Sequence, residues 1–406
     1  MTEVAQTVET AGTAEPGAVR APATGSAAGP AAGALSLARQ AEENPAELSE
    51  FAAAARGRLP KPVWDYLDAG SGDETMINAN RPVLDRVWLR PRVLTGTTEV
   101  DTTTTLFGSA LSAPVGVAPM AHQCLFHPEG EVATAKAAGD AGLLFIASIF
   151  ANRTIEDVVA ASDGPVWQQL YWLRQREQFE GFIARAEAAG VGALVLTVDA
   201  PVVARRPRDA RNAFVLPPDI QAVNLDTAVV HTMHETLAGS SAIARHSAQQ
   251  FQRGLSWTDL AWLRRRTELP LLLKGVLSAQ DAQLAVEHGI NGVIVSNHGG
   301  RQLGGAVPAA YALPEIAAAV GDQCVVLVDG AFRCGHDILK ALVLGAHTVL
   351  IGRPAIWGLT CDGTEGAAAV LNLLCAELEE AMLLSGLPHL TAARTAPFAS
   401  DLLPGR

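Results

Sequence analysis

Short apolar runs recur along the chain, and Ala-rich stretches with the phase of amphipathic helices separate most of them, as in residues 179–187. Apolar runs of this length are typical of strands that are buried on both faces. Eight alternations of strand and helix predict an α/β fold of the (β/α)8 TIM-barrel type. An open doubly wound sheet is the alternative, because the number of strands alone does not close a barrel. The eight runs span residues 113–119, 143–148, 166–171, 193–199, 271–275, 293–296, 325–330 and 349–353.

Three further stretches complete the predicted domain. Residues 46–60 are expected to form a helical segment in front of the barrel, and residues 366–384, rich in Ala, Leu and Glu, a long helix packed on it. The connection after the fourth strand, residues 201 to about 256, is too long for an ordinary barrel loop and is expected to cover the site as a lid.

The long connection also carries three histidines, which raises the question of a metal site. His231 and His234 have the spacing of two ligands on one helical face, and His246 follows. No set of carboxylates or cysteines accompanies them, so we interpret them as solvated loop residues and predict no metal site.

Composition limits the class of protein. The chain has 406 residues, which suits one barrel with extensions, and residues 1–45 are predicted to be a disordered tail rich in Ala, Gly and Pro. The domain is assigned to residues 46–406. A net charge of −12 without a basic tract argues against nucleic acid as a partner. No apolar run reaches the roughly 18 residues that span a bilayer.

The cysteine count and the tail bear on the compartment. Five cysteines are an odd number without metal-type spacing, and we expect free thiols in a reducing cytoplasm. The tail lacks the basic start and continuous apolar segment of a signal peptide. The predicted localisation is therefore cytoplasmic.

Polar or small residues end most of the apolar runs. Active sites of barrels lie at the carboxyl ends of the strands, so these residues together predict one lined pocket. Each of them, taken separately, would also fit an ordinary turn. They are Ser148, Thr197, Asp199, Lys274, Ser296, His298, Asp329, Gly330, Gly352 and Arg353.

The most informative stretch is Ser296-Asn297-His298-Gly299-Gly300-Arg301-Gln302-Leu303. His298 can transfer a proton near neutral pH, and Arg301 is a permanent cation whose planar fork fits a carboxylate. The paired glycines let backbone approach a ligand closely. A base and an anion-binding group three residues apart suggest a substrate with an acidic proton and a carboxylate. A packed histidine beside a surface arginine is the alternative.

This stretch resembles the signature of the FMN-dependent 2-hydroxy-acid oxidase and dehydrogenase family, which includes glycolate oxidase, lactate oxidase and mandelate dehydrogenase. The resemblance runs from about Ala55 to Leu387. Within it, residues 63–65 and 169–174 are most similar to bacterial hydroxymandelate oxidases. Similar proteins are often tetramers, so a homo-oligomer, specifically a tetramer, is expected.

The resemblance implies FMN as the cofactor. Lys274 would lie near flavin N1 and stabilise the reduced ring, and Ala121 would lie near N5, where Ala weakly favours oxygen as the acceptor. Ala331 replaces a glycine that is usual in the family. The phosphate and ribityl chain would be held by Asp329, Gly330, Ala331, Arg333, Gly352 and Arg353, and the other flavin contacts would be Pro119, Met120, Ala121, Ser148, Gln169, Thr197 and Ser296.

The resemblance also implies a substrate site. Arg206 and Arg301 would hold the carboxylate; Pro207 follows Arg206 where the family commonly has Glu, and Arg206 is preferred to Arg205. Tyr66 and Tyr171 would hydrogen-bond the substrate. His298 would accept a proton from either Cα or the hydroxyl, and Asp199 would orient His298.

Substrate selectivity is expected to come from apolar residues near the reacting carbon. The resemblance implies that Met120 and Phe150 face the substrate side chain. Phe150 replaces a tryptophan of glycolate oxidase. With Leu125 and Phe126 near, an aryl or larger aliphatic substituent is expected.

The resulting hypothesis is an enzyme that oxidises an (S)-2-hydroxy acid, mandelate-like in one version, to the 2-oxo acid, while dioxygen is reduced to hydrogen peroxide. A dehydrogenase that uses a quinone or a protein acceptor is the alternative within the same chemistry. From other classes, the alternatives are a non-catalytic flavin-binding barrel and an isomerase that uses reduced flavin, although no second anion site suits the diphosphates such isomerases often bind.

Overall fold

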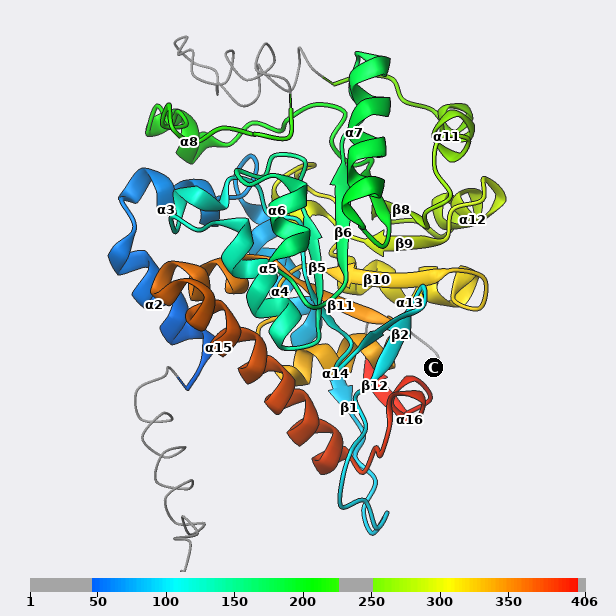
Figure 1. Ribbon diagram of the computed structural model, residues 1–406. Helices are drawn as coiled ribbons and strands as arrows, with labels where there is room; N and C mark the ends of the chain where they lie inside the picture. Colours follow the sequence, from blue (N-terminus) through cyan, green and yellow to red (C-terminus); the bar gives the residue numbers. More distant parts are fainter. Residues whose placement is uncertain (1–45, 226–250, 401–406) are drawn as a thin grey trace, which may run out of the picture. The chain divides into compact units, whose positions relative to one another are not determined.

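All eight apolar runs form strands, which close into one parallel barrel (Figure 1). The neighbours in space follow the chain order, and the last strand pairs with the first, with Val349 opposite Val115. The barrel prediction is thus confirmed, and the open sheet is wrong. The strands are β4 (Val115–Val117), β5 (Leu144–Ala147), β6 (Val166–Leu170), β7 (Leu194–Thr197), β8 (Leu271–Val276), β9 (Gly292–Val295), β10 (Val325–Asp329) and β11 (Thr348–Ile351).

The structure is a computed structural model that describes residues 46–225 and 251–400. The predicted disordered tail and the three loop histidines, His231, His234 and His246, lie outside the described residues. The predicted lid is described only at its two ends, residues 201–225 and 251–256; α8 (Pro207–Arg211) forms in the first, and α11 (Trp257–Arg264) follows the second.

Strand side chains alternate between the barrel interior and the surrounding helices. In β5, Leu144 and Ile146 belong to an inner apolar cluster, whereas Phe145 and Ala147 belong to the outer one. The hairpin of β2 (Thr104–Leu106) and β3 (Ser109–Leu111) contributes two leucines to the inner cluster, and its turn packs on Trp167 at the start of β6. The hairpin therefore closes the amino end of the barrel, and the carboxyl end is left for the site.

Helices surround the barrel, as Figure 1 shows. The predicted helix at residues 366–384 is longer than expected, because α15 begins at Arg353 and runs to Ser385. It bends at Asp362 and Gly363, where Gly363 has a φ of +51° that glycine adopts readily. The other helices that follow strands are α5 (Glu131–Asp140), α6 (Ile155–Ala160), α7 (Arg176–Ala189), α12 (Ala279–Glu287), α13 (Ala309–Val320) and α14 (Gly335–Val343).

The segment before the barrel forms three helices rather than one. The helix predicted at residues 46–60 is α2 (Leu48–Arg58), and Pro60 separates it from α3 (Lys61–Asp68), because proline disfavours a helical residue before it. A third helix, α4 (Thr75–Asp85), follows. Three small elements lie outside the barrel: β1 (Val87–Leu89) pairs antiparallel with β12 (Phe398–Ser400), and α16 (Leu390–Arg394) precedes β12.

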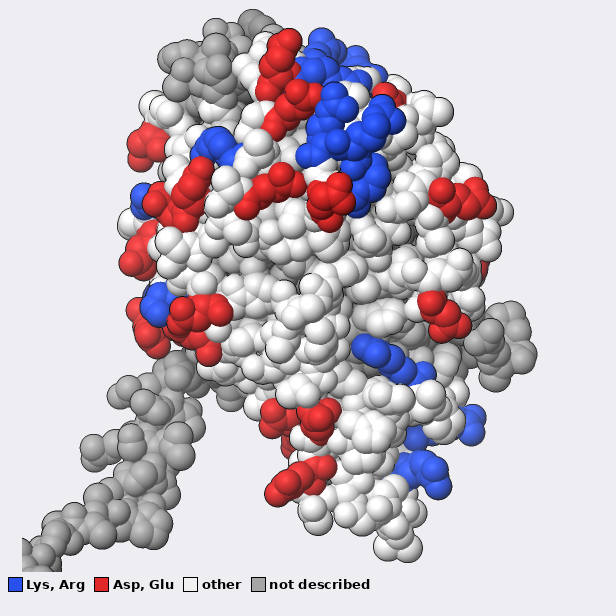
Figure 2. Space-filling view, turned by 45° about the vertical axis from the view of Figure 1, so that its right-hand side comes forward, with Lys and Arg blue, Asp and Glu red and all other residues white. Residues whose placement is uncertain are grey.

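Charged side chains on the surface form groups of mixed sign, as Figure 2 shows for one face. Ion pairs also join neighbouring outer segments: Arg185 of α7 pairs with Glu156 of α6, and Arg266, just after α11, pairs with Glu180 of α7, both at 2.8 Å. Exposed pairs of this kind each stabilise a protein by about 0–1 kcal/mol. Within the described residues, no helix combines the length and apolar character needed to cross a bilayer.

Candidate active site

A cavity opens at the carboxyl ends of the strands and encloses about 1260 Å³, part of it open to solvent. This is ample for a cofactor together with a small substrate, since ligand pockets usually measure about 300–1,000 Å³. The predicted site residues in its wall are Tyr66, Pro119, Met120, Ala121, Phe150, Tyr171, Arg206, Lys274, His298, Arg301, Asp329, Gly330, Ala331, Arg333, Gly352 and Arg353.

Four of the predicted flavin-contacting residues do not line this cavity but form a polar layer at the top of the barrel interior. Each lies two residues after an inward-facing apolar residue, so the alternation of the strand points it inward. Gln169 Nε2 donates to Thr197 Oγ1 at 3.0 Å, and Lys274 Nζ donates to Ser296 Oγ at 2.9 Å. The fourth, Ser148, lies 3.4 Å from Gln169 Oε1.

The predicted base and its partner are in contact. His298 Nδ1 lies 3.0 and 3.2 Å from the two carboxylate oxygens of Asp199. A carboxylate only accepts, so Nδ1 carries the proton and Nε2 is the basic nitrogen. Burial raises the pKa of Asp199, but the charge and hydrogen bond of His298 and the charge of Lys274 outweigh it, and the pKa is lowered. Asp199 is therefore an anion that stabilises protonated His298.

Backbone conformation places the imidazole. His298 has a φ of +58°, which is uncommon for a residue with a side chain, and its N–H donates to Ser296 Oγ at 3.0 Å. Backbone strain of this kind is concentrated at functional sites. Ala331 has a similar φ of +68°, at the position where the family usually has glycine.

Asp199 approaches His298 closely because Gly275 lies behind it. Gly275 has a φ of +108° at a register shift in β8, and a Cβ built there would lie 2.4 Å from Asp199 Cβ. Real Cβ atoms do not come so close, so any side chain at this position would displace Asp199.

We expect the Gly275→Ala variant to lose activity by about 10²-fold, since a displacement near 1 Å in a catalytic arrangement has an effect of that order. The loss should appear in kcat, measured by peroxide formation. The matched control is Gly289→Ala, where φ is also positive, at +73°, but the added Cβ meets nothing within 4 Å. Equal losses in both variants would contradict the proposed packing.

Lys274 is a buried cation with two partners. Its Nζ lies 3.0 Å from Asp329 Oδ2 and 2.9 Å from Ser296 Oγ. Burial lowers the pKa of Lys274, but the charges of Asp329 and Asp199 raise it by more. The pKa is therefore raised overall, and Lys274 remains an ammonium. The other oxygen of Asp329, Oδ1, is buried and accepts no hydrogen bond within the described residues. A ribityl hydroxyl would supply the missing donor, so this position fits FMN.

Three partly buried arginines in the cavity wall point to bound anions. Burial, together with the charges of Arg206 and Arg353, lowers the pKa of Arg301 to about 9. Burial and the charge of Arg353 likewise lower the pKa of Arg333 to about 10. In the described part of the chain, Arg301, Arg333 and Arg353 form no ion pair and donate to backbone carbonyls. The positive charges of these arginines repel one another. A bound phosphate and a bound carboxylate would offset that repulsion, which fits FMN and an acid substrate.

We expect inorganic phosphate at millimolar concentration to raise the melting temperature of FMN-free protein more than chloride at equal ionic strength. The phosphate would relieve the repulsion among the guanidinium groups of the cavity wall, and a phosphate concentration of ten times Kd corresponds to about 1.4 kcal/mol of stabilisation. Differential scanning fluorimetry measures the shift. The Arg353→Met variant should lose the difference between the two salts; a difference retained in full would show that the phosphate binds elsewhere or acts through the solvent.

The predicted substrate groups converge from three segments. Tyr66 comes from α3, Arg206 precedes α8, and Arg301 follows the short 3-10 helix η3 (His298–Gly300). The Arg301 guanidinium lies 5.5 Å from the centre of the Tyr66 ring. Burial raises the pKa of both Tyr66 and Tyr171, so their hydroxyl groups keep the proton as donors. Arg206 lines the cavity, whereas Arg205 is exposed.

Aromatic rings form one wall of the cavity. The ring centres of Phe150 and Tyr171 lie 5.6 Å apart, and Phe251 lies 5.5 Å from the first and 4.8 Å from the second. Phe126 also lines this cavity, whereas Leu125 packs against the main core. Aromatic rings prefer offset or tilted contacts with other rings, so this wall favours a ligand with a flat apolar group.

Sequence reasoning missed several residues of the cavity wall. His122 and Phe251 line it, and Gln302 receives the N–H of Ala204 at 2.9 Å and donates to Val202 O at 3.1 Å. Gln302 thereby holds the loop that leads to Arg206. Its place directly after Arg301 was a usable signal, but Phe251, which follows the long connection, had none.

The comparisons with known proteins agree with this geometry. The family model described as FMN-dependent dehydrogenase matches residues 55–398. A 4-hydroxymandelate oxidase of Amycolatopsis orientalis is 45% identical over 347 residues, which cover 86% of this chain and 96% of that protein. An L-lactate oxidase of Nostoc sp. is also 45% identical, over 86% of this chain and 96% of that protein. A glycolate oxidase of Spinacia oleracea is 41% identical over 87% of this chain and 95% of that protein.

Solved structures of mandelate oxidase are also similar to this chain. A mandelate oxidase crystallised with (S)-4-hydroxymandelic acid superimposes with a TM-score of 0.85 at 43% identity, over 88% of this chain and 100% of that chain. The family model covers the barrel, the helices α3 and α4 before it, and every predicted site residue. The chain belongs to the FMN-dependent 2-hydroxy-acid oxidase family and is an FMN-dependent oxidoreductase.

Proposed function

We propose that this enzyme oxidises an (S)-2-hydroxy acid with an aryl substituent, in the manner of mandelate, to the 2-oxo acid. The observation that carries the proposal is the single cavity that brings the His298–Asp199 pair together with Arg206 and Arg301. A base beside two cations fits a substrate that gives up a proton next to its carboxylate.

The substrate carboxylate would bind between Arg206 and Arg301. Both guanidinium groups line the cavity, and the low pKa of Arg301 reflects burial and the charge of Arg206, which an anion would offset. Tyr66 and Tyr171 would donate hydrogen bonds to the carboxylate or the hydroxyl. This arrangement fixes the orientation of the substrate, so its reacting carbon faces His298.

His298 would accept the substrate proton on Nε2. The proton comes either from Cα or from the hydroxyl, and both routes end with a protonated imidazole. Asp199 keeps Nδ1–H in place and stabilises that cation from 3.0 Å. When bound, FMN would supply the two-electron redox chemistry of the reaction, with dioxygen as the proposed final acceptor and hydrogen peroxide as its product.

The cofactor would be held by residues of the last two strands and by the polar layer. Arg333, Arg353 and the start of α15 suit its phosphate, since the N-terminus of a helix attracts anions. Asp329 Oδ1 would accept from a ribityl hydroxyl, and Lys274 would place its charge beside the ring. Gln169, Thr197, Ser148 and Ser296 would orient these groups.

The aromatic wall supports an aryl substrate. The rings of Phe150, Tyr171 and Phe251 contact one another in the wall of the cavity that Met120 also lines. The similar proteins named as hydroxymandelate and mandelate oxidases are consistent with this choice. Ala121 at the cavity supports dioxygen as the acceptor.

We also propose that the enzyme is cytoplasmic and forms a homotetramer. Light scattering of purified protein would test the tetramer.

The test is a panel from glycolate and lactate to (S)- and (R)-mandelate, assayed for peroxide and oxygen consumption. We expect the highest kcat/KM for (S)-mandelates and equal amounts of oxygen consumed and peroxide formed. Substrate-dependent bleaching of FMN without oxygen consumption would indicate a dehydrogenase with a quinone or protein acceptor. No bleaching with any acid would indicate a flavin-binding barrel without turnover.

A further inference from the structure

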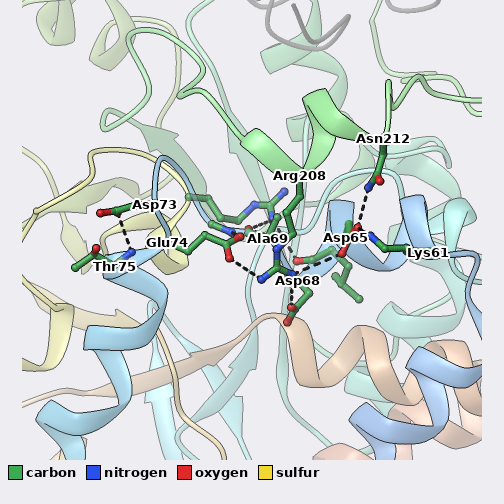
Figure 3. A network of polar contacts seen from close by, with 12 residues as sticks. Lys61, Asp65, Asp68, Ala69, Asp73, Glu74, Thr75, Arg208 and Asn212 are labelled. Atoms are coloured by element: carbon green, nitrogen blue, oxygen red, sulfur yellow. Dashed lines mark hydrogen bonds and ion pairs between the residues drawn. The ribbon is translucent and has the colours of Figure 1, made fainter.

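Arg208 lies at the centre of an ion-pair network outside the cavity wall (Figure 3). Its Nη1 lies 2.9 Å from Asp68 Oδ2 and 3.6 Å from Asp65 Oδ1, and its Nη2 lies 2.6 Å from Glu74 Oε2. Asp65 and Asp68 belong to α3, and Glu74 precedes α4, whereas Arg208 belongs to α8. One guanidinium from α8 therefore joins two neighbouring segments, α3 and the start of α4, that lie more than 130 residues earlier in the sequence.

Other contacts join the same segments. Asn212 Nδ2 donates to Asp65 Oδ2 at 2.8 Å, as Figure 3 also shows, and Lys61 pairs with the same carboxylate. The backbone N–H of Gly72 donates to the carbonyl of Arg205 at 2.9 Å. The start of the connection after β7 is thus fastened to the segment around α3.

The network lies directly behind two proposed substrate groups. Tyr66 lies between Asp65 and Asp68 in α3, and its ring stacks on Phe214 at 4.8 Å. Arg206 is the N-cap of α8, two residues before Arg208. The separation between Tyr66 and Arg206 therefore depends on how tightly α8 is held to α3.

The charges make this attachment depend on Arg208. Asp65, Asp68 and Glu74 are three carboxylates, and the cations paired with them are Arg208 and Lys61. Burial lowers the pKa of Arg208, but its hydrogen bonds and charge interactions with Glu74 and Asp68 outweigh burial, so the pKa is raised overall. Without Arg208, the carboxylates would repel one another, and water would replace a forked contact.

We propose that Arg208 is a positioning residue that sets the distance between Tyr66 and Arg206 and so determines affinity for the substrate carboxylate. It contacts neither substrate nor cofactor. Its loss would loosen α8 against α3 and weaken the binding of substrate and product equally, while His298, Asp199 and the cofactor residues keep their geometry. This inference rests on the proposed function.

The experiment compares Arg208→Met with Arg211→Met, which removes the same charge from the exposed face of the same helix. We expect Arg208→Met to raise KM for (S)-mandelate about tenfold with kcat little changed, as for the loss of uniform binding. The dissociation constant of benzoylformate, measured from changes in the FMN spectrum, should rise by the same factor. Arg211→Met should leave both values unchanged.

Two more variants test the cause. Arg208→Lys keeps the charge without the fork, so its KM should lie between those of wild type and Arg208→Met. Arg208→Met combined with Glu74→Gln removes one unpaired carboxylate, and its KM should return toward the wild-type value. A merely structural role would instead lower the melting temperature and FMN affinity together with kcat, and this result would overturn the proposal.

The two levels of the hypothesis fail in different ways. An active wild type whose KM and benzoylformate affinity do not change in Arg208→Met would overturn the role of Arg208 alone. Equal changes in Arg211→Met would also overturn it, since they would show a general charge effect. A wild type that neither oxidises hydroxy acids nor binds benzoylformate would overturn the proposed function, and the role of Arg208 with it.

Discussion

The His298→Gln variant is expected to show a kcat about 10²–10⁴-fold lower than wild type, the range that a positioned proton acceptor contributes. Glutamine fills similar space but cannot accept a proton in this pH range. Affinity for benzoylformate should change little, since the groups proposed to bind the carboxylate remain. Anaerobic stopped-flow measurement of FMN bleaching on addition of (S)-mandelate gives the rate of the chemical step directly.

Two further variants show whether a loss of kcat in His298→Gln is specific to the proposed base. His288→Gln replaces a histidine at the end of α12 that does not line the cavity, and it should have wild-type kinetics. Asp199→Asn should lower kcat as well, because an amide does not stabilise the imidazolium and can hydrogen-bond the wrong tautomer. A His298→Gln enzyme with an unchanged bleaching rate would remove His298 from the chemistry and favour another base.

The Arg301→Met variant is expected to lose most of its kcat/KM. Removing one partner of a buried charged contact costs about 2–5 kcal/mol, which corresponds to roughly 30-fold to several thousand-fold in kcat/KM. Benzoylformate should bind more weakly in proportion. Steady-state kinetics and titration of the FMN spectrum measure the two effects.

The controls separate charge from geometry. Arg301→Lys keeps the cation but not the planar fork, so it should recover only part of the loss. Arg205→Met removes a cation from an exposed position next to Arg206 and should change kcat/KM little. If Arg205→Met lowered kcat/KM more than Arg206→Met, the assignment of Arg206 rather than Arg205 to the substrate would be wrong.

Sequence periodicity was most informative where burial is uniform along an element. All eight strands were predicted because barrel strands are buried on both faces and read as continuous apolar runs. The same alternation explains the polar layer, since Lys274 follows the inward-facing Leu272 by two residues and Ser296 follows Ile294 in the same way.

Helix boundaries were less predictable. The first part of α15, from Arg353 to the bend at Asp362, was not predicted, because it begins with Arg353-Pro354 immediately after a strand. The helix predicted at residues 46–60 ended earlier than expected, and α3 began a new direction after Pro60. Both errors arose where a proline allows either a helix start or a break.

The sequence alone determined the barrel class and the family, because strand periodicity and the Ser296–Leu303 motif are local patterns. It also identified His298 and Arg301, whose chemistry depends on residue type. Tertiary structure alone decided which distant groups complete the site: Gly275 behind Asp199, Phe251 beside Tyr171, and Arg208 of α8 paired with Asp68 of α3. Contacts between segments tens to hundreds of residues apart leave no local pattern, because they arise only when the ring of strands closes.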